Sequence, residues 1–146
     1  MPDAPRLDHV GLNVADLDAA ERWYCAAFGF ERSLALRIDA VELDIVMLIN
    51  GSGQRLELLS RPGSSLGMRA SNPAAAVLSE GYGHMAFDVV GVDAVYERLL
   101  GLGATPVMPP QPSPEPDVRM AFVADPEGNL VELLDRTAGT AEALGP

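Results

Sequence analysis

Apolar and polar positions follow the same order twice along the chain. Residues 7–14 and 82–89 alternate with a period of two, which is typical of a strand with one buried face. Each is followed by a segment with helical spacing and then by further alternating segments. We expect these further strands near 32–39, 42–50 and 54–60 in the first half, and near 119–124 and 129–135 in the second.

Helix signals bound the two helical segments. Asp16 is a candidate N-cap, and Gly29 is a candidate stop signal. The residues expected on the buried stripe of the first helix are Ala19, Ala20, Trp23, Tyr24 and Ala27. Those expected on the second are Val92, Val95, Leu99 and Leu102, with Gly103 closing the helix.

The similarity of the two halves indicates an internal duplication. His9 and His84 stand at the start of the alternating segments, and Glu57 and Glu132 lie in the last ones; both separations are 75 positions. The two histidines are the only ones in the chain. At the same separation Gly53 matches Gly128. A repeat of this length decides the architecture, because each copy becomes one structural module.

We therefore predict an α+β fold of two βαβββ modules, which form a cup-shaped mixed sheet with the helices outside. The expected boundaries are module 1 at 1–60, a linker at 61–81, module 2 at 82–136 and a frayed tail at 137–146, within one compact domain. The prolines of 105–116 exclude a central strand there. We expect this stretch to be an edge or a lid loop rather than a polyproline docking motif.

Composition narrows the function classes. A formal charge of −11 argues against sequence-independent nucleic-acid binding, which needs a cationic surface. Cys25 is the single cysteine, so no disulfide scaffold is expected. No apolar run approaches the roughly 20 residues of a membrane span. We expect a cytoplasmic protein that binds a small-molecule substrate, and open sheet edges favour a homodimer.

Alternation predicts which side chains share a face. Because the neighbours of the two glutamates in sequence are apolar and pack inward, Glu57 and Glu132 are left on the opposite face of each sheet, as are His9 and His84. Two carboxylates and two imidazoles in one cavity need a compensating charge, which a divalent cation supplies. Nitrogen and oxygen ligands without a thiolate suit Zn, Ni, Co, Mn or Fe(II).

Other candidates are less specific. Asn13 and Asp88 share the same face by alternation, so they are candidate substrate contacts or ordinary rim residues. Arg119 and Arg55 either bind a substrate carboxylate or are ordinary strand residues. Cys25 is expected to be an inert, half-buried thiol.

Three segments of the chain resemble the vicinal oxygen chelate superfamily, which includes glyoxalase I, extradiol dioxygenases and bleomycin-binding proteins. They are 9–18, 83–89 and 125–133, and the resemblance extends over about 6–136. It implies paired βαβββ modules, within one chain or across a dimer.

By this resemblance, one divalent metal is bound by His9, Glu57, His84 and Glu132. The set is most similar to bacterial-type glyoxalase I. It implies isomerase or lyase chemistry on a small oxygen-bearing metabolite through a metal-bound enediolate, with Glu132 as the base and Glu57 able to share that role. Asn13 stands where that enzyme has an arginine for glutathione, which weakens the glutathione assignment. The alternatives are a metal-free protein that binds a drug or natural product, and a small extradiol-type dioxygenase.

Overall fold

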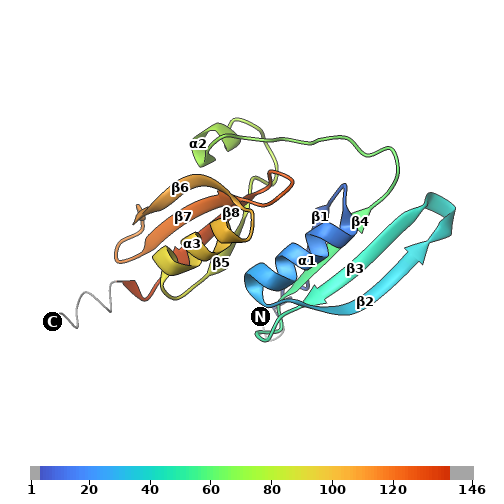
Figure 1. Ribbon diagram of the computed structural model, residues 1–146, viewed down its shortest axis with the longest axis horizontal. Helices are drawn as coiled ribbons and strands as arrows, with labels where there is room; N and C mark the ends of the chain where they lie inside the picture. The colour runs from blue at the N-terminus through green and yellow to red at the C-terminus, as the bar shows by residue number, and fades with distance from the viewer. Residues whose placement is uncertain (1–3, 139–146) are drawn as a thin grey trace. The chain divides into compact units, whose positions relative to one another are not determined.

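The structure of the protein is a computed structural model in which residues 4–138 are described. The chain consists of two units that divide between Ser65 and Leu66. Each unit contains one four-stranded mixed sheet with a helix on one face (Figure 1). The α+β class and the two βαβββ modules predicted from the sequence are confirmed.

The first unit has strand order β1-β4-β3-β2. Its elements are β1 (Val10–Asn13), α1 (Leu17–Phe28), β2 (Glu31–Ile38), the short 3-10 helix η1 (Asp39–Val41), β3 (Leu43–Ile49) and β4 (Arg55–Ser60). β1 is parallel to β4, and the other pairs are antiparallel. The first and last strands of the module are therefore neighbours.

The second unit repeats this topology in the order β5-β8-β7-β6. After the short helix α2 (Pro73–Ala76), its elements are β5 (Met85–Asp88), α3 (Val92–Gly101), β6 (Thr105–Pro112), β7 (Arg119–Ala124) and β8 (Leu130–Asp135). β5 is parallel to β8, as β1 is to β4. The duplication read from the sequence is thus a duplication of structure.

Helix α1 begins and ends where its sequence signals lie. The Asp16 carboxylate accepts a hydrogen bond from the Ala19 amide at 2.9 Å, and Gly29 ends the helix in the left-handed conformation at φ 68°. Trp23 and Tyr24 are buried, and the helix packs on β3 and β4. The predicted N-cap, stop signal and buried stripe are confirmed, except that Ala19 is only half-buried.

Helix α3 is capped from a distance. Its N-cap residue is Gly91, which has no side chain to offer. The buried carboxylate of Asp135, at the end of β8, instead accepts hydrogen bonds from the amides of Gly91 at 2.8 Å and Val92 at 3.1 Å. Tyr96 is buried, whereas Val95, which was predicted for the buried stripe, is only half-buried. Leu102 is also not part of the core, because it follows the helix as its exposed C-cap.

Burial alternates along the last strand of each module. Leu56 and Leu58 in β4 are fully buried against the helix side, as are Val131 and Leu133 in β8. The side chains between them must point to the opposite face. We call the face of each sheet that does not carry α1 or α3 the open face; it carries Glu57 in the first sheet and Glu132 in the second.

The predicted bounds of the first strands need correction, whereas the edge position of the proline-rich stretch is confirmed. The first strands are shorter than 7–14 and 82–89, because β1 pairs only with β4 and β5 only with β8, and these ladders begin at Val10 and Met85. The histidines therefore lie immediately before the strands. The proline-rich stretch was predicted to be an edge or a lid loop, and Thr105–Pro112 is an edge strand, β6, with two register shifts against β7.

The connecting segment is attached to the second unit. The Arg69 guanidinium donates to the carbonyl of Glu127 at 2.7 Å, and α2 is capped by the side chain of Asn72. The expected boundaries at 60/61, 81/82 and 136/137 stay predictions, and most of the predicted tail lies outside the described residues. Within residues 4–138, no helix is both long and apolar enough to cross a membrane.

The cap on α3 gives a stability prediction. Replacing Asp135 with Ala leaves the buried amide of Val92 and the part-buried amide of Gly91 without this acceptor, which should lower the free energy of unfolding at pH 7 by about 1–3 kcal/mol. Asp135→Asn keeps an oxygen acceptor and should cost less. Urea denaturation measures both. An Ala variant as stable as wild type would contradict the capping role.

The same carboxyl should make stability depend on pH. Burial raises the pKa of Asp135, but hydrogen bonds from Thr137, Val92 and Gly91 outweigh it, so the pKa lies below the ordinary value of 3.8. A lowered native pKa adds stability above the unfolded pKa, and that stability is lost as pH falls through the native pKa. The stability difference between wild type and Asp135→Asn should therefore shrink below about pH 4.

Candidate functional site

The parallel pairing of first and last strands brings one histidine and one glutamate together in each unit. Glu57 is the register partner of Gly11, and Glu132 is the register partner of Ala86. Each histidine lies two residues before that partner, on the same face of the sheet. The same two-residue offset therefore produces two equivalent His–Glu pairs, one on each open face.

In the second unit the two side chains are in direct contact. Nε2 of His84 and Oε2 of Glu132 are 2.9 Å apart, which is a hydrogen bond. The Glu132 side chain is 16% exposed and that of His84 is 38% exposed. The ring of Phe122, from β7, meets the imidazole edge-on at 5.2 Å between centroids. The pair is therefore held on one side by an aromatic ring and remains accessible to solvent.

The first unit has the same pair in a looser arrangement. Nε2 of His9 lies 3.8 Å from Oε1 of Glu57, too far for a hydrogen bond. The other ring nitrogen, Nδ1, is 2.7 Å from the carboxylate of Asp8. Arg55 lies 3.5 Å from the same carboxylate. The hydrogen bond with His9 and the charge of Arg55 hold the pKa of Asp8 below its ordinary value.

The donor atoms of each pair have the spacing of two ligands of one cation. Nitrogen and oxygen ligands at about 2.1 Å from a metal, at right angles, are about 3 Å apart. The His84–Glu132 separation fits this, and the His9–Glu57 separation corresponds to a wider angle. Within residues 4–138, no group of three or more such side chains gathers around one point. Each unit thus offers two ligands, and the predicted set of four stays a prediction.

Almost the whole chain matches one known protein family. Residues 6–133 match the Glyoxalase/Bleomycin resistance protein/Dioxygenase superfamily. The chain belongs to this superfamily. A probable lactoylglutathione lyase from Synechocystis sp. is 24% identical over 135 residues, which cover 89% of this chain and 95% of that protein.

Solved structures of glyoxalase-superfamily proteins share the fold. A glyoxylase/bleomycin resistance protein/dioxygenase domain from Frankia sp. EAN1pec superposes with a TM-score of 0.73 at 22% identity, covering 91% of this chain and 93% of that one. A glyoxalase family protein from Enterococcus faecalis gives a TM-score of 0.72 at 26% identity, with coverages of 88% and 96%. The resemblance inferred from the sequence is thereby confirmed.

Two further candidates of this glyoxalase-superfamily chain lie on the open faces. Asn13 and Asp88 are the last residues of β1 and β5, and they pair with Leu59 and Leu134 respectively. Each is four residues beyond the histidine of its unit and is exposed. They lie on the same face as the His–Glu pairs, and their role as substrate contacts stays a prediction.

Arg119 is not brought to the open face. It shares its face of β7 with the fully buried Ala121 and Val123, which is the helix side of the sheet. Its guanidinium donates two hydrogen bonds to the carboxylate of Asp93 in α3, at 2.9 and 3.2 Å. Counting the alternation of 119–124 in the sequence would have indicated this placement.

Sequence reasoning overlooked Asp8 and Phe122 as neighbours of the pairs. Asp8 could have been recognised from its position next to His9. Phe122 could have been recognised from the pairing of β7 with β8, which places it opposite Glu132. Cys25 is half-buried, and burial, together with Glu21 and Glu31, raises the pKa of its thiol. The thiol therefore stays protonated at neutral pH, as an inert cysteine would.

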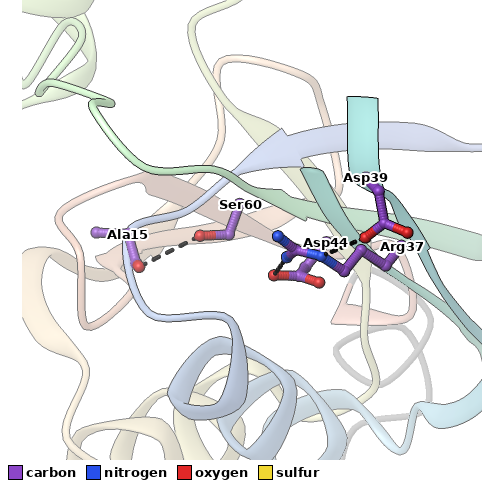
Figure 2. Close-up of polar contacts among 5 residues, drawn as sticks. All are labelled: Ala15, Arg37, Asp39, Asp44 and Ser60. Carbon is purple, nitrogen blue, oxygen red and sulfur yellow. Dashed lines mark hydrogen bonds and ion pairs between the residues drawn. The ribbon is translucent and has the colours of Figure 1, made fainter. Parts of the chain in front are cut away.

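An open pocket of about 720 Å³ lies at the N-terminus of α1, beside β2 and β3. Its lining includes Arg37, which is held by the carboxylates of Asp39 and Asp44, both at 2.9 Å (Figure 2). Nearby, Ser60 donates to the Ala15 carbonyl at 3.4 Å. Neither His9 nor Glu57 lines this pocket, so the candidate site is the open face rather than this pocket.

The placement of Arg119 can be tested through stability. Its ion pair with Asp93 is partly exposed, so Arg119→Met should lower the free energy of unfolding by less than about 1 kcal/mol. It should leave the binding of divalent cations unchanged. Thermal denaturation and a zinc titration check the two parts. A large loss of ligand or metal binding in a stably folded variant would instead indicate that Arg119 takes part in the functional site.

Proposed function

We propose that this protein is a metal-dependent enzyme of the glyoxalase type, acting as an isomerase or lyase on a small oxygen-bearing metabolite. The observation that supports this most directly is found in both modules: an imidazole nitrogen just before the first strand lies beside a carboxylate oxygen of the parallel last strand, at 2.9 and 3.8 Å. Membership of the superfamily and the similarity to a probable lactoylglutathione lyase agree with it.

The proposed ligands of the cation are His9, Glu57, His84 and Glu132. This donor set fits Zn, Ni, Co, Mn or Fe, because it combines imidazole and carboxylate without a thiolate. When bound, such a cation stabilises negative charge that develops on the oxygens of the substrate. The two pairs come either from one chain or from two copies of it.

The proposed base is Glu132. Its carboxylate takes the proton from the hydroxyl-bearing carbon next to the substrate carbonyl and returns it to the former carbonyl carbon, while the hydroxyl proton passes to the former carbonyl oxygen. The low exposure of its side chain limits the orientations available to the carboxylate. Glu57 can share the role because it occupies the equivalent position of the repeat. Asn13 and Asp88 are proposed to contact the substrate.

Metal binding is the first test. The purified full-length protein should retain about one divalent ion for every four proposed ligands, by elemental analysis. His9→Gln and His84→Gln should each lose the ion because each removes a nitrogen ligand. Glu97→Gln, on the exposed face of α3, is the matched control and should retain it. Protein that binds no ion after incubation with Zn, Ni, Co, Mn or Fe(II) contradicts the proposal.

The second test concerns proton transfer. Protein loaded with metal is incubated in deuterated water with the hemithioacetal of methylglyoxal and glutathione, and with thiol-free 2-hydroxy ketones, and NMR follows deuterium incorporation. Glu132→Gln keeps the size of the side chain but cannot accept the proton, so the exchange rate should fall by about a hundredfold or more. Glu57→Gln should cost less, and the fold should be unchanged in both. Equal rates in wild type and Glu132→Gln would exclude this base.

A metal-free binding protein is the second candidate function, and one observation favours it. Leu34, Leu36 and Ile38 of β2 are exposed by 52%, 41% and 43%. Leu34 and Leu36 pair with Met47 and Ile45, on the same face as Glu57. An apolar open face suits an apolar drug or natural product. Tight binding of such a compound by protein that retains no metal would favour this function; oxygen uptake with a catechol would favour a dioxygenase.

A further inference from the structure

The two His–Glu pairs differ in what surrounds them, although the repeat makes them equivalent. The residue before His9 is Asp8, whereas the residue before His84 is Gly83. Arg55, which pairs with Asp8, is replaced at the matching position by Leu130. Only the histidine of the first unit therefore has charged side chains beside it at these two positions.

The Asp8 contact determines which nitrogen of His9 carries a proton. An ionised carboxylate only accepts hydrogen bonds, so Nδ1 of His9 must donate to it across the 2.7 Å contact. In the neutral imidazole the other nitrogen, Nε2, then has a free lone pair. Nε2 is also the nitrogen that faces Glu57.

His84 has the opposite arrangement. Its Nε2 is 2.9 Å from the Glu132 carboxylate, so Nε2 donates and carries the proton. Gly83 offers no side chain to Nδ1. A cation that uses Nε2 of His84 must first displace that proton and open the contact with Glu132, whereas Nε2 of His9 is already prepared to act as a ligand.

We propose that Asp8, oriented by Arg55, is a positioning residue that fixes the proton of His9 on Nδ1 and so presents Nε2 as the ligand nitrogen of the first pair. This inference rests on the proposed metal function. Carboxylates that hold the second nitrogen of a ligating imidazole orient the ring and make it a better donor. The two pairs are therefore inequivalent, with the first one prepared in advance.

The role of Asp8 is directional, which separates it from an ordinary surface ion pair. The Asp8 side chain is 70% exposed and that of Arg55 is 42% exposed, so their attraction alone is screened by solvent. The hydrogen bond from His9 to Asp8 fixes the position of the proton on the imidazole ring, and this effect does not depend on how much the bond stabilises the fold. Its effect should appear in the tautomer and in metal affinity, and stability should change little.

The first measurement uses metal-free full-length protein labelled with ¹⁵N at histidine. NMR distinguishes a nitrogen with a proton from one without it, and there are only two histidines to assign. Wild-type His9 should be in the Nδ1-protonated form and His84 in the Nε2-protonated form. Asp8→Ala should shift His9 toward a mixture of tautomers, whereas Asp8→Asn keeps an oxygen acceptor and should retain much of the wild-type population.

The second measurement is the affinity for Zn²⁺, by competition with a chelator. Asp8→Ala should bind about tenfold more weakly, the lower end of what loss of such a partner usually costs, because Asp8 is exposed. Asp8→Asn should fall between the two. The matched control is Asp39→Ala, which removes another exposed aspartate from an ion pair with an arginine and should leave both readouts unchanged.

A gain-of-function variant tests the same idea on the other pair. Gly83→Asp places a carboxylate before His84, and a Cβ atom added at Gly83 meets no atom within 4 Å. The variant should move the proton of His84 toward Nδ1 in the metal-free protein. It should also leave His9 unchanged.

The outcomes separate the inference from the proposed function. An unchanged His9 tautomer or an unchanged Zn²⁺ affinity in Asp8→Ala overturns the positioning role while leaving the metal function in place. A wild-type protein that binds no Zn²⁺, Ni²⁺, Co²⁺, Mn²⁺ or Fe²⁺ overturns the metal function, and the tautomer measured without metal still decides whether Asp8 sets the proton on His9.

Discussion

The parallel ladder between the first and last strand of each module is the constraint on which the candidate site depends. In both units this ladder is continued by one backbone hydrogen bond of 2.8 Å beyond the strand, from Val14 to Leu59 and from Val89 to Leu134. A shift of one residue would turn Glu57 or Glu132 into the helix side of the sheet, among fully buried leucine and valine side chains. Burying a carboxylate there without a partner is costly, so the apolar core fixes the register that brings glutamate beside histidine.

The duplication preserved the backbone arrangement and changed the side chains that support it. Helix α1 is capped by its own Asp16, whereas the matching position in the second unit is Gly91 and the cap comes from Asp135. The position that matches Asp135 is Ser60, which makes one weak hydrogen bond at 3.4 Å. The same requirement, an acceptor for the first amides of the helix, is therefore met from two different elements. The residues beside the two histidines also differ between the units, with Asp8 before His9 and Gly83 before His84.

Local patterns were enough to predict most of the fold. Alternation and cap residues gave the topology of both modules and the face of each glutamate, because these depend on neighbours within one strand or helix. What they missed depends on contacts between distant segments. Asp135 caps a helix whose N-cap residue lies 44 residues earlier, and the length of β1 is set by β4. Arg119 was chosen as a candidate for its charge, without regard to its place in the alternation of β7, and its role in substrate binding stays a prediction.

The charges around the two pairs also bear on what the protein can bind. Five arginines in or next to the strands are each paired with a carboxylate: Arg32 with Glu21, Arg37 with Asp39 and Asp44, Arg55 with Asp8, Arg119 with Asp93 and Arg136 with Glu115. The chain as a whole carries a formal charge of −11. An anionic substrate would therefore meet carboxylates and paired guanidinium groups. In the proposed metal site, the carboxylates of Glu57 and Glu132 bring two negative charges, which a divalent cation would balance; substrate oxygens would then meet the positive charge of that cation.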